Sequence, residues 1–394
     1  MQMYLSMLII SALLSFFLTW GVRDFAVRRK IFFPRDSHHI HERAVPRIGG
    51  IAIFTVFSGF VVLYILFFHP NLPPSQFAMD IAKVAVPGTV LFAVGLADDF
   101  NGLRARIKLL FQIVGGVALY LSGLSFPALD LYFVGIPVGA ILSFCLTIFL
   151  VVLLCNGLNF IDGLDGLAAG NAFLVCMPLF VLALITGRPV LSMWIVILAG
   201  TLLGFLFFNF NPASIFLGDS GSLFIGFILS GLLLSESRSG AHSLRLTCSL
   251  LVAFVLPISD TGLSVLRRLL NRRALFSPDR EHIHHRLLSI GFSHRQAVLI
   301  LYGVSVVVSC LSVFLFIAPP LAAAGAFAIC LLLAIQGFRK LRHIEDMYIL
   351  RRLQMSLHTI CRSPLHQQLE DQAIPVGDLD AYPEFSYFEE EVMK

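Results

Sequence analysis

The stretch VGAILSFCLTIFLVVLLCNGLNFIDGLDGLAAGNAFLVCMPLFVLALI, residues 138–185, shows the pattern that organises this chain of 394 residues. A long apolar run is followed by a short polar motif and then by a second apolar run. Runs of about 20 apolar residues span the hydrocarbon core of a bilayer as helices. The stretch therefore predicts transmembrane helices over 138–156 and 166–185, with a loop rich in Asp, Asn and Gly at one membrane surface.

The composition of the whole chain is that of a polytopic membrane protein. Hydrophobic residues make up 57% of it and charged residues only 13%, whereas a soluble domain carries about 25% charged residues. A net charge of +4 does not indicate a nucleic-acid partner, because its distribution follows the membrane topology. We expect an all-α protein with about eleven transmembrane helices, near 4–22, 48–68, 81–97, 107–124, 138–156, 166–185, 191–208, 221–235, 246–268, 297–317 and 321–337.

The distribution of basic residues predicts the orientation in the membrane. Of the 28 Lys and Arg residues, only Lys83, Arg188, Arg238 and Arg245 fall on one side. Since cytoplasmic loops carry the excess of basic residues, the N-terminus is expected outside and the polar loops in the cytoplasm. Residues 1–337 then form the transmembrane domain. Residues 338–394 form a cytoplasmic tail, with a basic amphipathic segment followed by an acidic end that is expected to be disordered.

The first polar motif on the predicted cytoplasmic face is Asp98-Asp99, at the end of the third span. Adjacent carboxylates repel each other, so a nearby cation is needed to keep both ionised. Such a pair suits metal binding or proton abstraction. The alternative is an acidic helix end that faces water, although the negative end of a helix dipole disfavours carboxylates.

The second motif runs from Asn159 to Leu167 and contains Asp162 and Asp165. If the segment is helical, the three polar residues share one face at i, i+3 spacing. If it is a loop, its glycines allow the backbone to approach a ligand closely. Either arrangement gathers oxygen ligands, and no Lys or Arg in the loop neutralises them. The alternative is a glycine-rich turn with solvated carboxylates.

The third motif, Gly218-Asp219-Ser220-Gly221, precedes the eighth predicted span. We expect Ser220 to cap that helix and the backbone N–H groups near the glycines to bind phosphate. Asp219 is a suitable ligand for a hard cation. The motif is not a P-loop, because no Gly-Lys-Ser/Thr sequence follows it.

The fourth motif runs from Ser277 to Arg286 and contains His282, His284 and His285. Ser277-Pro278-Asp279 is typical of a helix start, which would place His282 and His285 on one face. Zinc is one ligand for such histidines, although no Cys or fourth ligand is evident. A diphosphate bound by His and Arg side chains is the other. The first loop adds Arg43 and Arg47 as further phosphate candidates, and Ser293-His-Arg-Gln296 predicts a capping box for the next helix.

In combination, these motifs resemble those of the polyprenyl-phosphate N-acetylhexosamine-1-phosphate transferases (glycosyltransferase family 4), which are related to the phospho-MurNAc-pentapeptide translocases. The likeness covers about residues 34–300, through Val45–Gly50, Ala97–Asp99, Asn159–Leu167, Phe216–Ser222 and Pro278–Arg286 in that order. The His-Ile-His-His form is similar to that of the sugar-phosphate branch. The eleven predicted spans also match the architecture of this family.

The resemblance implies a role for each candidate residue. Asp98 is implied as the base that ionises the lipid phosphate, and the implied catalytic residues are Asp98, Asp99, Asp162 and Asp165. The implied ligands of Mg²⁺, with Mn²⁺ as an alternative metal, are Asp219 and Asp165. The implied substrate-binding residues are Arg47, Lys108, Asn159, Asn209, His282, His284, His285 and Arg286.

The resemblance further implies an enzyme of the bacterial inner membrane. Undecaprenyl phosphate would attack the β-phosphorus of a UDP-N-acetylhexosamine, UDP-GlcNAc foremost, and release UMP. This step initiates the synthesis of cell-envelope polysaccharides such as lipopolysaccharide. Membrane lipid is a partner, nucleic acid is not, and homodimerisation is left open.

Other functions fit part of the pattern. The same chemistry with UDP-FucNAc, UDP-QuiNAc or UDP-MurNAc-pentapeptide as donor would use the same motifs. An ion-coupled transporter would carry its acidic residues near mid-span, whereas here they lie at span ends. An intramembrane prenyltransferase would carry paired DxxD motifs, and only Asp162 and Asp165 have that spacing.

Overall fold

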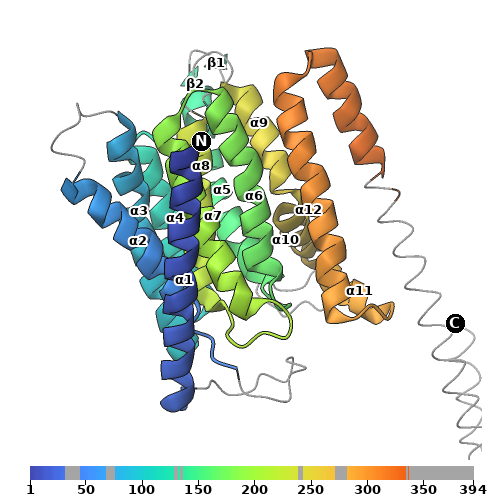
Figure 1. Cartoon of the computed structure of the whole chain (residues 1–394). Helices are drawn as coiled ribbons and strands as arrows, with labels where there is room; N and C mark the ends of the chain where they lie inside the picture. The colour runs from blue at the N-terminus through green and yellow to red at the C-terminus, as the bar shows by residue number, and fades with distance from the viewer. Residues whose placement is uncertain are drawn as a thin grey trace, which may run out of the picture. The chain divides into compact units, whose positions relative to one another are not determined.

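The computed structural model describes residues 1–31, 45–67, 76–127, 132–133, 136–237, 243–270, 282–333 and 336. Contacts divide the chain into two compact units, Met1–Leu332 and Leu333–Lys394. The first unit is a bundle of helices (Figure 1) with one short antiparallel hairpin. Its elements are α1 (Gln2–Arg28), α2 (Gly50–Phe67), α3 (Gln76–Asn101), α4 (Ala105–Leu121), β1 (Tyr132–Phe133), β2 (Ile136–Pro137), α5 (Val138–Ile161), α6 (Leu167–Ile185), α7 (Pro189–Asn209), α8 (Gly218–Glu236), α9 (Ser243–Ala253), α10 (Val255–Leu270), α11 (Ile283–Ser289) and α12 (His294–Ile317).

The all-α polytopic class is confirmed. Among the described residues, eight helices are long and apolar enough to cross a membrane, and the bent pair α9–α10 adds a ninth span if it counts as one. Helix α4 has 17 residues, and the apolar helix Pro320–Leu333 is also short. The count of eleven and the orientation therefore stay predictions. The tail 338–394 and the helix start expected at Ser277 lie outside the described residues.

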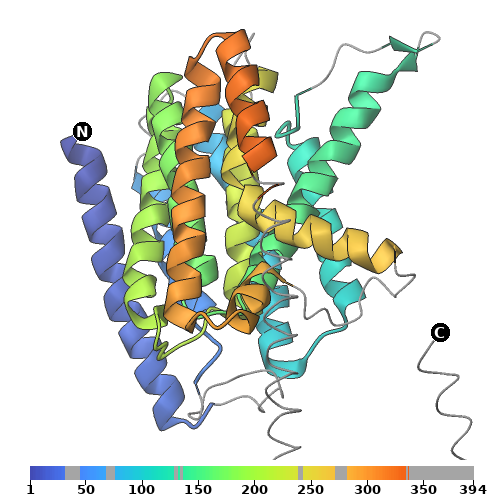
Figure 2. The ribbon, with the colours of Figure 1, turned by 90° about the vertical axis from the view of Figure 1, so that its right-hand side faces the viewer.

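The span predicted over 246–268 is not one straight helix. It breaks at Phe254 into α9 and α10, whose axes differ by 79°, and Figure 2 shows the second half, in gold, turned across the bundle. Pro257 explains the break, because it has no N–H to donate to the carbonyl of Ala253 and its ring clashes with that carbonyl. Apolarity alone predicts the length of a span but not this change of direction.

Helix α1 buries the small polar side chains in its middle and exposes many of its apolar ones, as expected for a helix in lipid. Ser11, Ser15 and Thr19 are fully buried, and Ser15 Oγ donates to the carbonyl of Thr201 in α7 at 2.6 Å. Opposite them, α7 carries the small-residue pair Gly200 and Gly204. Small residues let helix backbones approach closely where no hydrophobic effect drives association.

Helix α8 is the central helix of the site. It is almost entirely buried, and it packs chiefly against α3 and α5. A Cβ on Gly95 of α3 would lie 2.4 Å from the carbonyl oxygen of Asp219, and a Cβ on Gly50 of α2 would lie 2.3 Å from the nitrogen of Gly221. These two glycines bring α2 and α3 into backbone contact with the first turn of α8.

The α1–α7 contact predicts a position that tolerates no added methyl group. A Cβ on Gly204 would lie 2.1 Å from the carbonyl oxygen of Ala12, whereas a Cβ on Gly59 of α2 would meet nothing within 4 Å. We expect Gly204→Ala to cost about 1–3 kcal/mol through overpacking and to lower the melting temperature in detergent. Gly59→Ala is the matched control. Equal melting temperatures for the two variants would contradict the close α1–α7 contact.

Candidate active site

Residues from all four polar motifs line one cavity of about 290 Å³. The cavity lies at the end of the bundle that carries α11, opposite the β1–β2 hairpin (Figure 1). Of the predicted site residues, those that line it are Arg47, Asp99, Asn159, Asp162, Asp165, Asn209, Asp219, His282, His284 and His285. Asp98 and Lys108 lie beside it and contact Asp219, while Arg286 does not line it. The fold thus gathers the four motifs on one face.

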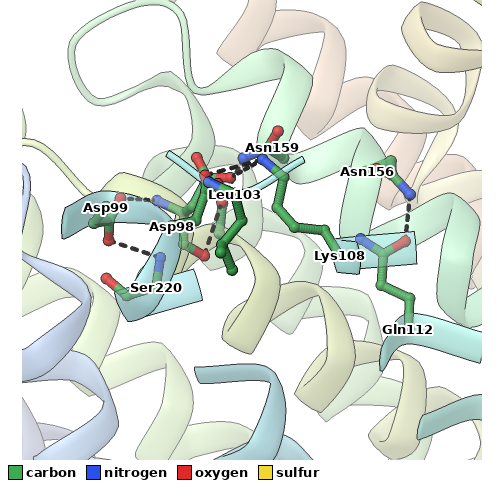
Figure 3. A network of polar contacts seen from close by, with 10 residues as sticks. Asp98, Asp99, Leu103, Lys108, Gln112, Asn156, Asn159 and Ser220 are labelled. Atoms are coloured by element: carbon green, nitrogen blue, oxygen red, sulfur yellow. Dashed lines mark hydrogen bonds and ion pairs between the residues drawn. The ribbon is translucent and has the colours of Figure 1, made fainter. Parts of the chain in front are cut away.

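The first turn of α8 is capped by carboxylates from other elements. Asp99 accepts from the backbone N–H groups of Asp219 at 2.7 Å and of Ser220 at 3.0 Å (Figure 3). The N–H of Gly218 is hydrogen-bonded to Asp162. These N–H groups have no partner within the helix, and they carry the positive end of the helix dipole. The two carboxylates are therefore stabilised next to them.

One expectation for this helix start is wrong. Ser220 is not its cap, because α8 begins at Gly218 and Ser220 lies within the first turn. The N–H groups of Gly218, Asp219 and Ser220 bind the protein's own carboxylates, and phosphate binding at this helix start stays a prediction. A local motif cannot reveal that Asp99 and Asp162, which are distant in sequence, bind these donors.

Lys108 links the two other carboxylates of this cluster. Its ammonium donates to Asp219 Oδ2 at 2.7 Å and to Asp98 Oδ2 at 3.0 Å. Asp98 Oδ1 also accepts from the backbone N–H of Leu103 at 2.6 Å (Figure 3). The neighbouring residues Asp98 and Asp99 therefore make different contacts. Asp98 binds the Lys108 ammonium, whereas Asp99 binds backbone N–H groups at the start of α8.

The Asn159 motif combines a helix end with a turn. Helix α5 extends to Ile161, so Asn159 lies in its last turn and its side chain donates to Ser222 Oγ at 3.0 Å. Asp162 follows in the turn, where burial and then the negative charges of Asp219 and Asp99 raise its pKa well above the usual value. Arg47 opposes this shift by attraction.

Asp165 and Asn209 engage the segment before α8. Asp165 Oδ2 accepts from the Asn211 side chain and from the backbone N–H of Ala213, both at 3.0 Å. Asn209 donates to the carbonyl of Ile215 at 2.9 Å, and its buried Oδ1 has no hydrogen-bond partner. The bonds of Asp165 favour a structural role for that oxygen, and its metal role stays a prediction.

The Val45–Gly50 segment is tied directly to the start of α8. The N–H groups of Gly49 and Gly50 donate to the carbonyls of Phe216 and Leu217 at 3.0 and 2.9 Å. This pairing places Arg47 on the cavity wall. The neighbouring candidate Arg43 lies outside the described residues.

The histidines His282, His284 and His285 form a second wall of the cavity. His282 and His284 stack with an interplanar angle of 4°, and the centroids of His284 and His285 are 4.3 Å apart. His284 is only 2% exposed, and burial together with the charge of His285 lowers its pKa to about 3. A Cβ on Gly163 would lie 2.6 Å from His284 Nε2, so the glycine turn is needed for this contact.

Two residues of this region were not predicted. Asp260 of α10 contacts His282 at 2.8 Å. The sequence feature that could have identified Asp260 is a carboxylate inside an apolar span, because such a residue is costly unless it is paired. His294 lines the cavity, but it lies within the sequence Ser293–Gln296, where the predicted capping box is confirmed. Because the capping box accounted for Ser293 and Gln296, the sequence offered no separate reason to predict a role for His294.

Within the described part of the chain, no three His, Cys, Asp or Glu side chains are grouped closely enough to hold a metal ion as they stand. Around Asp219, the Lys108 ammonium occupies the position between two carboxylates. Carboxylate and amide oxygens of this kind are the ligands that Mg²⁺ prefers.

Sequence comparisons match residues 81–236 to the profile of glycosyl transferase family 4. A probable undecaprenyl-phosphate N-acetylglucosaminyl 1-phosphate transferase of Bacillus subtilis (strain 168) is 32% identical, over 76% of this chain and 82% of that protein. The chain belongs to glycosyl transferase family 4. This matched segment extends from α3 to α8 and contains Asp98, Asp99, Lys108, Asn159 and Asp219.

Two further relatives of the family agree. Decaprenyl-phosphate N-acetylglucosaminephosphotransferase of Mycobacterium tuberculosis (strain ATCC 25618 / H37Rv) is 37% identical over 74% of this chain and 77% of its own length. Undecaprenyl-phosphate alpha-N-acetylglucosaminyl 1-phosphate transferase of Escherichia coli (strain K12) is 28% identical, over 66% and 70%. Family membership makes the protein a phosphotransferase enzyme and decides against the transporter and prenyltransferase alternatives.

The buried His284 predicts a loss of stability in mild acid. Its pKa falls from 6.5 to about 3 on folding, so below pH 6.5 the unfolded chain takes up a proton that the folded protein does not. At pH 5 this costs about 2 kcal/mol, at 1.36 kcal/mol for each pH unit below 6.5. We expect the drop in melting temperature between pH 7.5 and pH 5 to be smaller in His284→Asn than in the wild type. Equal drops would contradict the neutral, buried histidine.

Proposed function

We propose that the protein transfers GlcNAc 1-phosphate from UDP-GlcNAc to undecaprenyl phosphate, giving undecaprenyl-diphosphate-GlcNAc and UMP. The observation that carries the proposal is that an aspartate cluster and a group of histidines line the same cavity. The names of the relatives support the choice of sugar and lipid. The same chemistry with UDP-FucNAc, UDP-QuiNAc or UDP-MurNAc-pentapeptide is separated from it by donor competition.

The charges of the cavity suit a nucleotide diphosphate bound with a cation. One wall carries Asp99, Asp162 and Asp219, which would repel a diphosphate unless a cation lay between them. The other wall carries His282 together with His285, whose ring N–H can donate a hydrogen bond to a phosphate oxygen. We place the diphosphate between the two walls, with Arg47 as an additional cation.

We propose Mg²⁺, with Mn²⁺ as an alternative, as the metal of this site. Asp219 is its principal ligand, and Asp98 and Asp162 are further oxygen donors from the same cluster. The fit rests on the Lys108 ammonium, which already bridges Asp98 and Asp219 and so marks a position that attracts cations. When bound, the metal supplies Lewis-acid neutralisation of the charge that develops on the diphosphate.

The reaction needs little covalent chemistry from the protein. An oxygen of the lipid phosphate forms a bond to the β-phosphorus, and the bond from that phosphorus to the bridging oxygen of UMP breaks. Asp98 stays a candidate base, but its contacts with Lys108 and Leu103 favour a role in holding the ammonium near the reacting phosphates. Positioning and electrostatic stabilisation are the main contributions.

We further propose that the cavity faces the cytoplasm at the bacterial inner membrane. Its residues lie at helix ends and in the turns between them, so a lipid phosphate can reach them while its tail stays between helices and bilayer. The cytoplasmic tail 338–394, substrate roles for Asn209 and Arg286, and a homodimer remain parts of the proposal to be tested.

The proposed function predicts metal-dependent release of UMP. Purified protein with undecaprenyl phosphate, Mg²⁺ and UDP-GlcNAc is expected to form UMP, and Asp219→Asn is expected to lose at least 10²-fold in rate because the principal ligand loses its charge. Asp24→Asn, which changes an exposed carboxylate paired with Arg28 on α1, is the matched control and should keep full rate. UMP from none of the four UDP-sugars would refute the proposal.

The contacts of Lys108 predict that its ammonium competes with the metal. Lys108→Met keeps the length of the side chain but removes the charge between Asp98 and Asp219. We expect Mn²⁺ to bind roughly tenfold more tightly, about 1.4 kcal/mol, by electron paramagnetic resonance, while UMP release slows. Lys83→Met, on the neighbouring helix α3, is the control. Unchanged or weaker Mn²⁺ binding in Lys108→Met would contradict the competition.

A further inference from the structure

A single buried carboxylate holds the start of the histidine segment. Asp260 Oδ2 lies 2.8 Å from His282 Nδ1, and Asp260 Oδ1 accepts from the backbone N–H of Ile283 at 2.9 Å. The Asp260 and His282 side chains are only 3% and 9% exposed. The two carboxylate oxygens of Asp260 thus bind the His282 side chain and the backbone N–H of the next residue, Ile283.

The bend between α9 and α10 makes these two contacts of Asp260 possible. Asp260 lies on α10, six residues beyond the break at Phe254, where α10 has turned across the bundle (Figure 2). A straight continuation of α9 would have carried residue 260 in another direction. The break caused by Pro257 therefore has a consequence for the site, since it brings a carboxylate to the back of the cavity wall.

The remaining faces of the His282 ring are also fixed. Phe160 of α5 lies on one side with its centroid 5.5 Å away, and His284 stacks on the ring at 5.7 Å. With Nδ1 held by Asp260, imidazole geometry places Nε2 at the far edge of the ring. His282 lines the cavity, so Nε2 is the nitrogen available to a ligand.

An ionised carboxylate can only accept, so Asp260 requires a proton on His282 Nδ1. We propose that Asp260 is a positioning residue, which sets the tautomer and the orientation of His282 so that the unprotonated Nε2 accepts a hydrogen bond from a hydroxyl group of the donor's sugar. This inference rests on the proposed function for the identity of the ligand.

The anchoring of Ile283 alone does not require a carboxylate. An Asn side chain would accept from that N–H equally well at a smaller cost of burial in an apolar helix. Its NH₂ group would then face His282 Nδ1 and would force the proton onto Nε2. Asp260→Asn therefore keeps the shape and the anchor but reverses the tautomer.

The kinetic test measures UMP release by the full chain in detergent. We expect Asp260→Asn to lower kcat/KM for UDP-GlcNAc by 10–100-fold, the range for partners that orient a functional histidine. Asp24→Asn is the matched control and should not change it. In a His282→Asn background, the further loss from Asp260→Asn should be less than about threefold, because both changes remove one function. Independent losses that multiply, or a harmless Asp260→Asn, would overturn the proposal.

A second measurement needs neither activity nor a variant at Asp260. Full-length protein labelled with ¹⁵N-histidine should show a protonated Nδ1 for His282, whose signal is assigned by its absence in His282→Asn. A bare Nδ1 in the wild type would refute the positioning whatever the activity. A protonated Nδ1 in a protein that releases no UMP with any donor would instead refute the proposed function and leave the Asp260–His282 contact established.

Discussion

The N–H groups at the start of α8 hold the carboxylates of Asp99 and Asp162, and the site is arranged around this capping. The interaction pairs the positive end of a buried helix with two acidic side chains that lie close to Asp219. It also joins three elements, because Asp99 comes from the end of α3 and Asp162 from the turn after α5. Gly50 and Gly95 permit the close backbone packing that this capping requires.

A cluster of four neighbouring aspartates is stable only with compensation. Lys108 compensates the negative charges of Asp98 and Asp219 by direct ion pairs. Arg47, in the Val45–Gly50 segment, attracts Asp162. The cluster is therefore prepared for a further cation. Under the proposed function, the metal ion that accompanies the donor would be this cation.

The two walls of the cavity are supported in different ways. The aspartate wall depends on helix ends that meet within the bundle, whereas the histidine wall depends on one carboxylate carried by a bent helix. Asp260 reaches His282 because Pro257 interrupts the span. A single proline in an apolar run thus determines where the Asp260 carboxylate lies relative to the cavity-lining His282.

The sequence by itself determined the membrane class and the approximate positions of most helices, and it predicted the residue types of the candidate site. Apolar runs of spanning length leave few other folds, and the polar motifs Asp98-Asp99, Asn159–Leu167 and Gly218–Gly221 stand out against them. The resemblance carried by the ordered motifs also predicted the family. Only the tertiary structure decided which carboxylate caps α8, which one holds Lys108, and that Asp260 supports His282. Those assignments depend on hydrogen bonds between residues 10 to 121 positions apart, and a local sequence pattern does not show which donor and acceptor meet in the folded protein.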